Sequence, residues 1–349
     1  MPKFETAPTA LYSIDQLFAG YDPAKPASFK DTLDFQIYLE FVSDGGAAST
    51  NKPQVLARAE HDCSILQLIA EALTGGKIVA IMGGHAVARN TKAYSDTAKA
   101  AALLTERGFL VITGGGPGAM EAAHLGAAVG KPGADLDQAL ALMAQGVPDS
   151  KGMPVKLTGD PADPIIIDPD AVKFLGEYYK AGWELRQQYP KGGGLAIPTW
   201  MYGWEPTTVF AASVGKYFQN SIREDGLLAA ATHGIIYAEG KAGTLQEVFQ
   251  DAAQNYYRSF PAPAELGHGH FSPMVFLGDF WTVDDQADRR KTLPVKRLLD
   301  KLWQAGSIDT AKLVHYVSSP EQAADAISSF AGLEIAPALA IAKATAVQA

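Results

Sequence analysis

Short apolar runs alternate along this chain with longer segments in which apolar residues recur at helical spacing. The apolar runs cover 77–82, 109–113, 194–198, 234–238 and 272–277. The segment 91–107 and the segment that ends near Gly126 have the spacing of amphipathic helices. Repeated strand-then-helix units predict an α/β protein: a Rossmann-like, doubly wound parallel sheet with helices on both faces.

The same pattern divides the chain into segments. Residues 1–75 form a helical N-terminal extension, whose main helix is predicted at 53–73 and ends at Gly75-Gly76. Residues 76–330 form the Rossmann-like domain. Within it, 131–193 is an insertion interrupted by prolines, with a helix expected over 171–189, packed over the sheet's edge or the ligand cleft. Residues 331–349 are an Ala-rich tail, either a loosely held helix or disordered.

Composition narrows the classes of function. The chain has 349 residues, a net charge of −9 and one cysteine, Cys63. One cysteine excludes an internal disulfide framework and a Cys-cluster zinc site. The acidic balance argues against binding to nucleic acid polymers or anionic membranes. The first residues do not resemble a secretory signal, and no apolar stretch reaches membrane-span length, so we expect a cytoplasmic protein.

A glycine-rich loop follows the predicted strand 109–113. Gly114, Gly115, Gly116 and Gly118 stand just before a helix. Glycines let the backbone approach a ligand closely, and a helix N-terminus offers free N–H groups, so this loop predicts phosphate binding. The spacing also fits a dinucleotide fingerprint, but Asp135 and Asp137 follow no strand, which disfavours NAD.

A second loop follows the predicted strand 234–238. Gly240, Lys241, Gly243 and Thr244 precede a helix and could hold an anion through N–H groups, a hydroxyl and an ammonium. Glu247 lies one helical turn further on. Two interpretations remain open: Thr244 and Glu247 form a capping box that only begins the helix, or Glu247 is a catalytic carboxylate beside a phosphate site.

The two loops together resemble a known family. The run Gly114-Gly-Gly-Pro-Gly-Ala-Met-Glu-Ala-Ala and the later Gly-x-x-Gly-Thr-x-x-Glu are similar to those of the Lonely-guy nucleoside-monophosphate phosphoribohydrolases. Met82-Gly-Gly-His85 and the run Gly-Pro-Gly-Ala-Met-Glu look closer to the larger bacterial pyrimidine/purine nucleotide 5′-monophosphate nucleosidases. The resemblance covers about 77–280.

This resemblance implies an activity. The family hydrolyses the N-glycosidic bond of a nucleoside 5′-monophosphate, giving a free base and ribose 5-phosphate, without metal or organic cofactor. Its sites lie near a dimer interface, so a homodimer or higher homo-oligomer is implied. The small-molecule partner would be a nucleoside monophosphate.

The resemblance also implies site residues. Glu247 matches the catalytic glutamate, and Arg223 in Ser-Ile-Arg-Glu-Asp is the candidate for the catalytic arginine. Gly84, His85, Met120 and Glu121 are then expected to contact substrate. The carboxylate would stabilise the ribosyl cation or activate water, while the arginine would give electrostatic support.

The second loop departs from the family pattern. Glu239-Gly240-Lys241 replaces the family's Pro-Gly-Gly, which adds a negative charge near the expected phosphate and a lysine that could compensate it. Base recognition could come from the aromatic loop 199–205. His268 and His270 suggest a metal site, but no further ligand is suitably spaced nearby, so we expect none.

Two rival functions follow from the same residues. A catalytically silent nucleotide-binding or sensor protein would bind nucleotides tightly without releasing base, and would be indifferent to Glu247→Gln. An NAD-dependent oxidoreductase would show nicotinamide absorbance changes. An NAD-binding site of this kind needs an acidic residue at the end of a second strand, and the absence of such a residue argues against the oxidoreductase.

Overall fold

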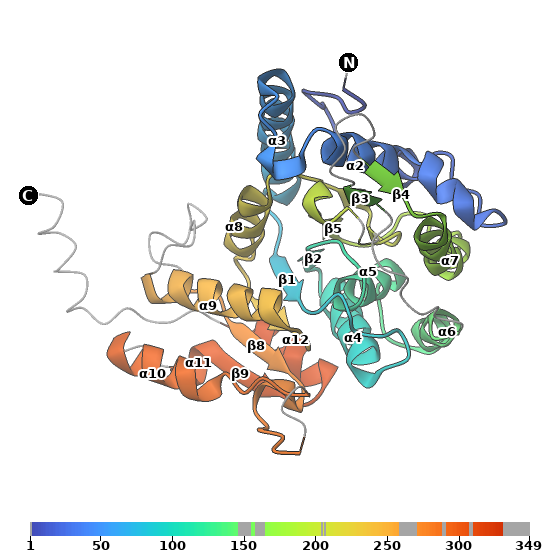
Figure 1. Ribbon diagram of the computed structural model, residues 1–349. Coiled ribbons are helices and arrows are strands. Elements are labelled where there is room, and N and C mark those ends of the chain that lie inside the picture. Colours follow the sequence, from blue (N-terminus) through green and yellow to red (C-terminus); the bar gives the residue numbers. More distant parts are fainter. Residues whose placement is uncertain are drawn as a thin grey trace, which may run out of the picture.

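The computed structural model describes residues 2–145, 155–157, 165–203, 205, 207–257, 271–287, 291–306 and 310–330. Within these ranges, seven strands form one sheet in the order β6-β5-β2-β1-β7-β8-β9, and every neighbouring pair is parallel. Figure 1 shows β1, β2, β5, β8 and β9 of this sheet among the helices. The strands are β1 Ile78–Met82, β2 Leu110–Thr113, β5 Leu195–Ala196, β6 Ser213–Val214, β7 Ile235–Tyr237, β8 Met274–Leu277 and β9 Val314–Val317.

Alternate residues of strand β1 belong to two separate buried clusters. Val79 and Ile81 of β1 share a buried cluster with residues of α4 (Lys92–Glu106), α5 (Ala119–Val129) and α12 (Pro320–Ser329). The neighbouring positions face the other cluster, which includes residues of α8 (Asn220–Ala230), α9 (Ala242–Tyr257) and α10 (Lys296–Gly306). Because both faces of the sheet are buried, the sequences of its central strands are continuous apolar runs. The predicted doubly wound, Rossmann-like fold is confirmed.

Strand β1 occupies the position where the strand order reverses. The chain proceeds from β1 outward through β2, β5 and β6, and later returns to β7 on the other side of β1. In open α/β sheets, ligands bind outside the carboxyl ends of the strands at this point. The loops after β1, β2 and β7, which include both predicted glycine loops, therefore meet at one edge.

The N-terminal segment is helical, as predicted. It contains α1 (Ile14–Leu17), the 3₁₀ helices η1 (Pro26–Asp31) and η2 (Gly46–Ala48), α2 (Leu33–Ser43) and α3 (Lys52–Leu73). Its apolar side chains belong to the same buried cluster as one face of the sheet. Tyr12 also forms an antiparallel bridge with Val214 of β6. This segment therefore completes the core beside β5 and β6.

The region 131–193 contains two described helices, α6 (Ala134–Met143) and α7 (Pro169–Arg186), and an antiparallel pair, β3 (Val155–Leu157) with β4 (Ile165–Ile167). Helix α7 was expected at 171–189 and begins earlier because Asp168 caps it and Pro169 occupies its first turn. Gly176 of α7 faces η1, where a Cβ would lie 1.9 Å from Pro26 O. The Ala-rich tail at 331–349 lies outside the described residues.

Candidate functional site

The loops after β1, β2 and β7 are joined by backbone hydrogen bonds. Gly84 N donates to Glu239 O at 2.7 Å, and Ala119 N donates to Gly84 O at 3.1 Å. Gly118 has φ +70°, and a Cβ there would lie 2.4 Å from Gly84 O; a Cβ on Gly84 would lie 3.2 Å from Gly240 Cα. Some of the glycines that were predicted to bind phosphate, such as Gly118, are therefore needed so that the loops can pack closely against each other.

A small pocket opens beside the first glycine loop. It is lined by Gly114, Gly115, Gly116, Met120, Pro198, Thr199, Tyr202, Glu205, Thr207, Lys216 and Arg223. Met120 lies under the loop and its Sδ is 3.4 Å from Gly116 N. The pocket thus brings together the first loop, the predicted substrate contact Met120 and the predicted catalytic arginine, at the carboxyl ends of β2, β5 and β6.

Arg223 reaches this loop from the first turn of α8. Its Nε donates to Ile197 O at 3.0 Å, and its Nη2 lies 3.4 Å from Gly114 O. A Cβ on Gly114 would come within 2.2 Å of that Nη2. A side chain at position 114 would therefore displace the guanidinium from the loop.

Glu247 lies on α9, the helix adjacent to α8, and is partly buried. Burial raises the pKa of its carboxyl to about 7; the nearby Arg223 guanidinium opposes this rise and Glu224 adds to it. A carboxyl with a pKa near neutrality suits acid–base chemistry. The structure thus places the two predicted catalytic residues within electrostatic reach of each other.

Helix α9 begins at Ala242, so Thr244 lies inside its first turn and not at the N-cap position. The capping-box interpretation of Thr244 and Glu247 is therefore wrong, because that motif needs the threonine at the N-cap. Thr244 is buried and packs on Gly240, where a Cβ would come within 2.2 Å of its Oγ1. Lys241 and Gly243 are exposed at the open N-terminus of the helix.

Glu121 lies apart from the other predicted substrate contacts. Its carboxylate accepts hydrogen bonds from Arg89 Nε at 2.8 Å and Nη2 at 2.6 Å. The hydroxyls of Tyr94 and Tyr178 donate to the same carboxylate at 2.9 and 3.1 Å. Glu121 and Arg89 are buried. These hydrogen bonds indicate a structural role for Glu121, which does not line the pocket.

His85 is exposed and pairs with a residue that the sequence analysis missed. Its Nδ1 lies 3.5 Å from Oε1 of Glu205. Burial raises the pKa of Glu205, while His85 and Arg223 oppose the rise. Glu205 belongs to the loop 199–205, which the sequence analysis considered only for its aromatic residues. The position of this loop after the predicted strand 194–198 could have marked Glu205 as a candidate site residue.

The aromatic loop itself has mixed roles. Trp200 is fully buried and its Nε1 donates to Asp34 at 2.9 Å, so it belongs to the core. Tyr202 lines the pocket and is partly exposed, so it remains a candidate for contact with a base.

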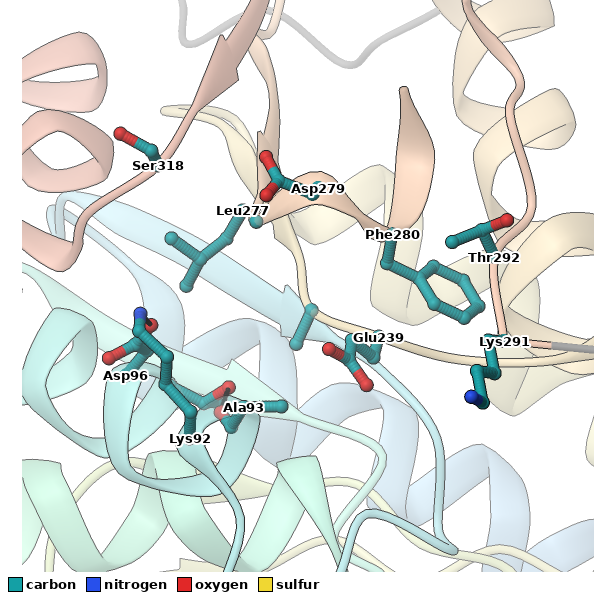
Figure 2. Close-up of a pocket in the computed structure, with 13 residues that line it drawn as sticks. Lys92, Ala93, Asp96, Glu239, Leu277, Asp279, Phe280, Lys291, Thr292 and Ser318 are labelled. Atoms are coloured by element: carbon teal, nitrogen blue, oxygen red, sulfur yellow. Dashed lines mark hydrogen bonds and ion pairs between the residues drawn. The ribbon is translucent and has the colours of Figure 1, made fainter. Parts of the chain in front are cut away.

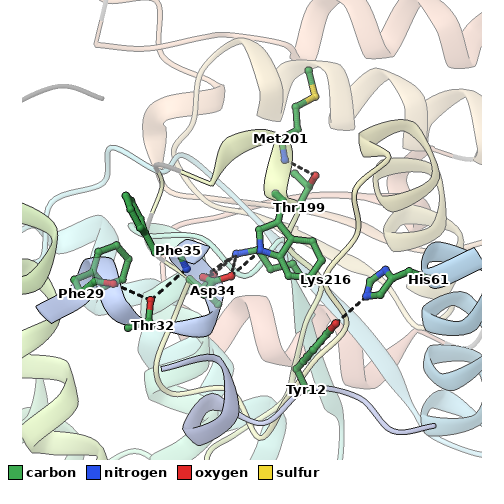
Figure 3. A network of polar contacts seen from close by, with 11 residues as sticks. Tyr12, Phe29, Thr32, Asp34, Phe35, His61, Thr199, Met201 and Lys216 are labelled. Atoms are coloured by element: carbon green, nitrogen blue, oxygen red, sulfur yellow. Dashed lines mark hydrogen bonds and ion pairs between the residues drawn. The ribbon is translucent and has the colours of Figure 1, made fainter. Parts of the chain in front are cut away.

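One wall of the pocket rests on a buried ion pair. Lys216 Nζ donates to both carboxylate oxygens of Asp34, at 2.7 and 2.9 Å, and to Thr207 Oγ1 at 2.9 Å (Figure 3). Burial lowers the pKa of Lys216, and Asp34 opposes that effect. All three N–H bonds of this ammonium are used, so it supports the pocket wall and has no donor left for a phosphate.

A second, larger cavity of about 370 Å³ is lined partly by Glu239, in the loop after β7, and by residues that follow β8 (Figure 2). Its lining includes Lys92, Asp96, Glu239, Asp279 and Lys291. Burial raises the pKa of Glu239, and Asp96 adds to the rise. The Glu239 carboxylate thus faces this cavity and not the pocket beside the first glycine loop.

Among the described residues, no three or more His, Cys, Asp and Glu side chains gather as metal ligands would. His268 and His270 lie outside those residues. Of the helices that the structure describes, none combines the length and apolar character needed to cross a bilayer.

Comparison with known proteins identifies no family for this chain. Neither a protein-family model nor a curated protein matches this chain. One solved structure that it resembles is the molybdenum cofactor binding protein from the phototrophic bacterium Rippkaea orientalis, with 13% identity, a TM-score of 0.35, and coverage of 73% of this chain and 98% of that one. A similarity this low does not indicate what the chain binds.

Proposed function

We propose that this protein is a phosphoribohydrolase: it cleaves the N-glycosidic bond of a nucleoside 5′-monophosphate and releases a free base and ribose 5-phosphate. The observation that carries the proposal is the position of Arg223, which reaches Gly114 of the first glycine loop and acts electrostatically on Glu247, at the edge where α/β sheets bind ligands. The two loop motifs had singled out the same pair through their resemblance to the Lonely-guy family.

The reaction develops positive charge on the ribose ring as the base departs. An ionised Glu247 would stabilise this charge and take a proton from the attacking water. Arg223 would hold the substrate by charge-assisted hydrogen bonds, since a guanidinium presents several donors in a fixed plane. The N–H groups of the glycine loops and of the α9 N-terminus would receive the 5′-phosphate and so orient the sugar. Water is the only co-reactant that this scheme needs.

The proposal includes a homodimer. Along α3, the residues Leu56, Ala59, Cys63, Leu66 and Ala70 are exposed and spaced by three and four positions. Leu56 and Leu66 expose 58% and 46% of their surface. Such an apolar stripe fits the seam between two packed helices. Sedimentation velocity tests this: a dimer that Leu56→Lys with Leu66→Lys converts to monomer supports it, and a monomeric wild type contradicts it.

The activity is tested with AMP, GMP, CMP, UMP and IMP, each followed by chromatography for free base. Glu247→Gln is the catalytic variant, and Glu177→Gln, an exposed glutamate on α7, is its matched control. The corresponding nucleosides test the need for the phosphate. Base release that needs the phosphate and is lost only in Glu247→Gln supports the proposal. Tight nucleotide binding without release, unchanged by Glu247→Gln, would instead favour a nucleotide sensor.

A further inference from the structure

We propose that Glu205 is a second catalytic carboxylate of this site and supplies the proton that the departing base takes up. The inference rests on the proposed function and adds to it the acid that neither Glu247 nor Arg223 supplies.

Glu205 is held between two of the converging loops. Its backbone N donates to Tyr202 O at 2.8 Å, which closes a turn at the end of the loop that follows β5. Its Oε1 lies 3.5 Å from His85 Nδ1, in the loop after β1. Its Oε2 faces the loop after β2, since a Cβ on Gly116 would lie 3.6 Å from it. The side chain is 24% exposed, so it can still meet a bound molecule.

The chemistry leaves one role unfilled. A base departs with the electron pair of the broken bond, and protonation makes it a better leaving group. Arginine cannot give up a proton at neutral pH. Glu247, in its proposed role, accepts a proton from water. Glycosidases solve the same problem with two carboxyl groups, one of them kept protonated by its surroundings.

Three influences act on Glu205 within the pocket. Burial raises the pKa of its carboxyl, whereas His85, from the loop after β1, and Arg223, from α8, both lower it. Lys216 and Tyr202 line the same pocket, and the ammonium of Lys216 is bound to Asp34. Burial is the largest influence, so the protonated form is favoured more than it is in a free glutamate.

The proposed step balances as follows. The bond between C1′ and the base nitrogen breaks, and its electron pair goes to that nitrogen, which takes the proton of Glu205. A water oxygen bonds to C1′, and Glu247 takes the water's proton. Nucleotide plus water become base and ribose 5-phosphate, and proton exchange with solvent restores both carboxyl groups.

The test compares two leaving groups on the same sugar phosphate. AMP needs protonation at its base, whereas 4-nitrophenyl β-D-ribofuranoside 5-phosphate releases a stable nitrophenolate without it. Removal of a general acid costs about 10²- to 10⁴-fold. We therefore expect Glu205→Gln to lower kcat on AMP by at least about 100-fold while changing kcat on the nitrophenyl compound by less than about fivefold. Glu177→Gln serves as the unaffected control.

A conservative variant gives a second readout. Glu205→Asp keeps a carboxyl group whose ordinary pKa is slightly lower than that of glutamate. We expect it to regain part of the lost kcat on AMP and to move the high-pH fall in kcat to lower pH. Thermal unfolding and AMP binding by each variant show whether the pocket is intact.

Each other outcome has a definite meaning. Equal losses on both substrates, or a change in KM alone, would make Glu205 a binding residue and overturn the inference. Undiminished base release by Glu205→Gln would overturn it and leave the phosphoribohydrolase function standing. No base release by the wild-type protein would overturn both.

Discussion

Arg223 Nε donates a hydrogen bond to the carbonyl oxygen of Ile197 at 3.0 Å, and this contact ties helix α8 to the end of strand β5. The rest of the guanidinium is thereby directed at Gly114, in the first glycine loop. The backbone thus fixes the position of the charged group before any ligand arrives, which lowers the entropy lost on binding.

This relationship predicts the behaviour of Arg223→Lys. Lysine keeps the charge but cannot donate to Ile197 while also reaching over Gly114, because its ammonium is a single point. We expect kcat/KM for the best nucleotide to fall by about 10- to 100-fold, the equivalent of losing one charge-assisted hydrogen bond. Steady-state kinetics measure it. Full activity in this variant would show that charge alone suffices there.

The raised pKa of Glu247, about 7, predicts a pH dependence of activity. The carboxyl is neutral below that value and charged above it. If the charged form is required, kcat/KM falls about tenfold for each pH unit below about 7. A pH profile of the wild-type protein measures this, and a limb near pH 4 would contradict it.

The same pKa predicts an effect of Glu247→Gln on stability. A folded-state pKa above the ordinary value of a glutamate means that this group favours folding most below about pH 4 and progressively less as the pH rises to about 7. Glutamine carries no charge at any of these values. We expect Glu247→Gln to melt at a higher temperature than the wild type at pH 8, and the difference to shrink toward pH 4.5. A variant that melts lower than wild type at pH 8 would oppose this.

Gly114→Ala should impair the site without unfolding the protein. The added methyl would come within 2.2 Å of Arg223 Nη2, so the guanidinium has to shift from the position that Ile197 gives it. We expect at least about a tenfold loss in kcat/KM, comparable to removing a charge-assisted hydrogen bond. Gly226→Ala on α8 is the matched control, because nothing lies within 4 Å of its Cβ position. Unchanged kinetics in Gly114→Ala would contradict the placement of Arg223.

Glu121→Gln should act on stability. The change leaves the buried Arg89 guanidinium without its charged partner, which typically costs about 3–5 kcal/mol. Urea unfolding measures the loss. The same substitution at the exposed Glu177 should stay within about 0.5 kcal/mol of wild type. A loss below about 1 kcal/mol in Glu121→Gln would show that the pair contributes little.

Local patterns predicted most of the sheet. Strands buried on both faces, such as β1 and β8, are unbroken apolar runs, and glycines mark the loops that follow. Strand β6 was missed because it has only two residues and exists through pairing with β5 and Tyr12. Strand β9 was also missed: its residues are only half-buried, and alternation with His315 weakens the apolar signal.

The family resemblance of the sequence pointed to Arg223 and Glu247, and the structure places them within electrostatic reach of each other, while their catalytic role stays a prediction. Glu205 was not predicted because its relevance comes from its pairing with His85 and from the pocket that it shares with Gly116, and both residues are remote from it in sequence. Glu121 looked like part of a motif, but its partners Arg89 and Tyr178 lie on separate segments that only folding brings together.

The bridge between Tyr12 and Val214 has a consequence for self-association. Strand β6 ends one side of the sheet, and unprotected edge strands are templates for pairing with other chains. Tyr12 N donates to Val214 O at 3.0 Å, and Val214 N donates to Tyr12 O at 2.9 Å, so the chain's own beginning occupies that edge. The N-terminal segment therefore covers part of this edge strand, and we expect a variant that lacks Tyr12 to leave the edge open to pairing with another chain.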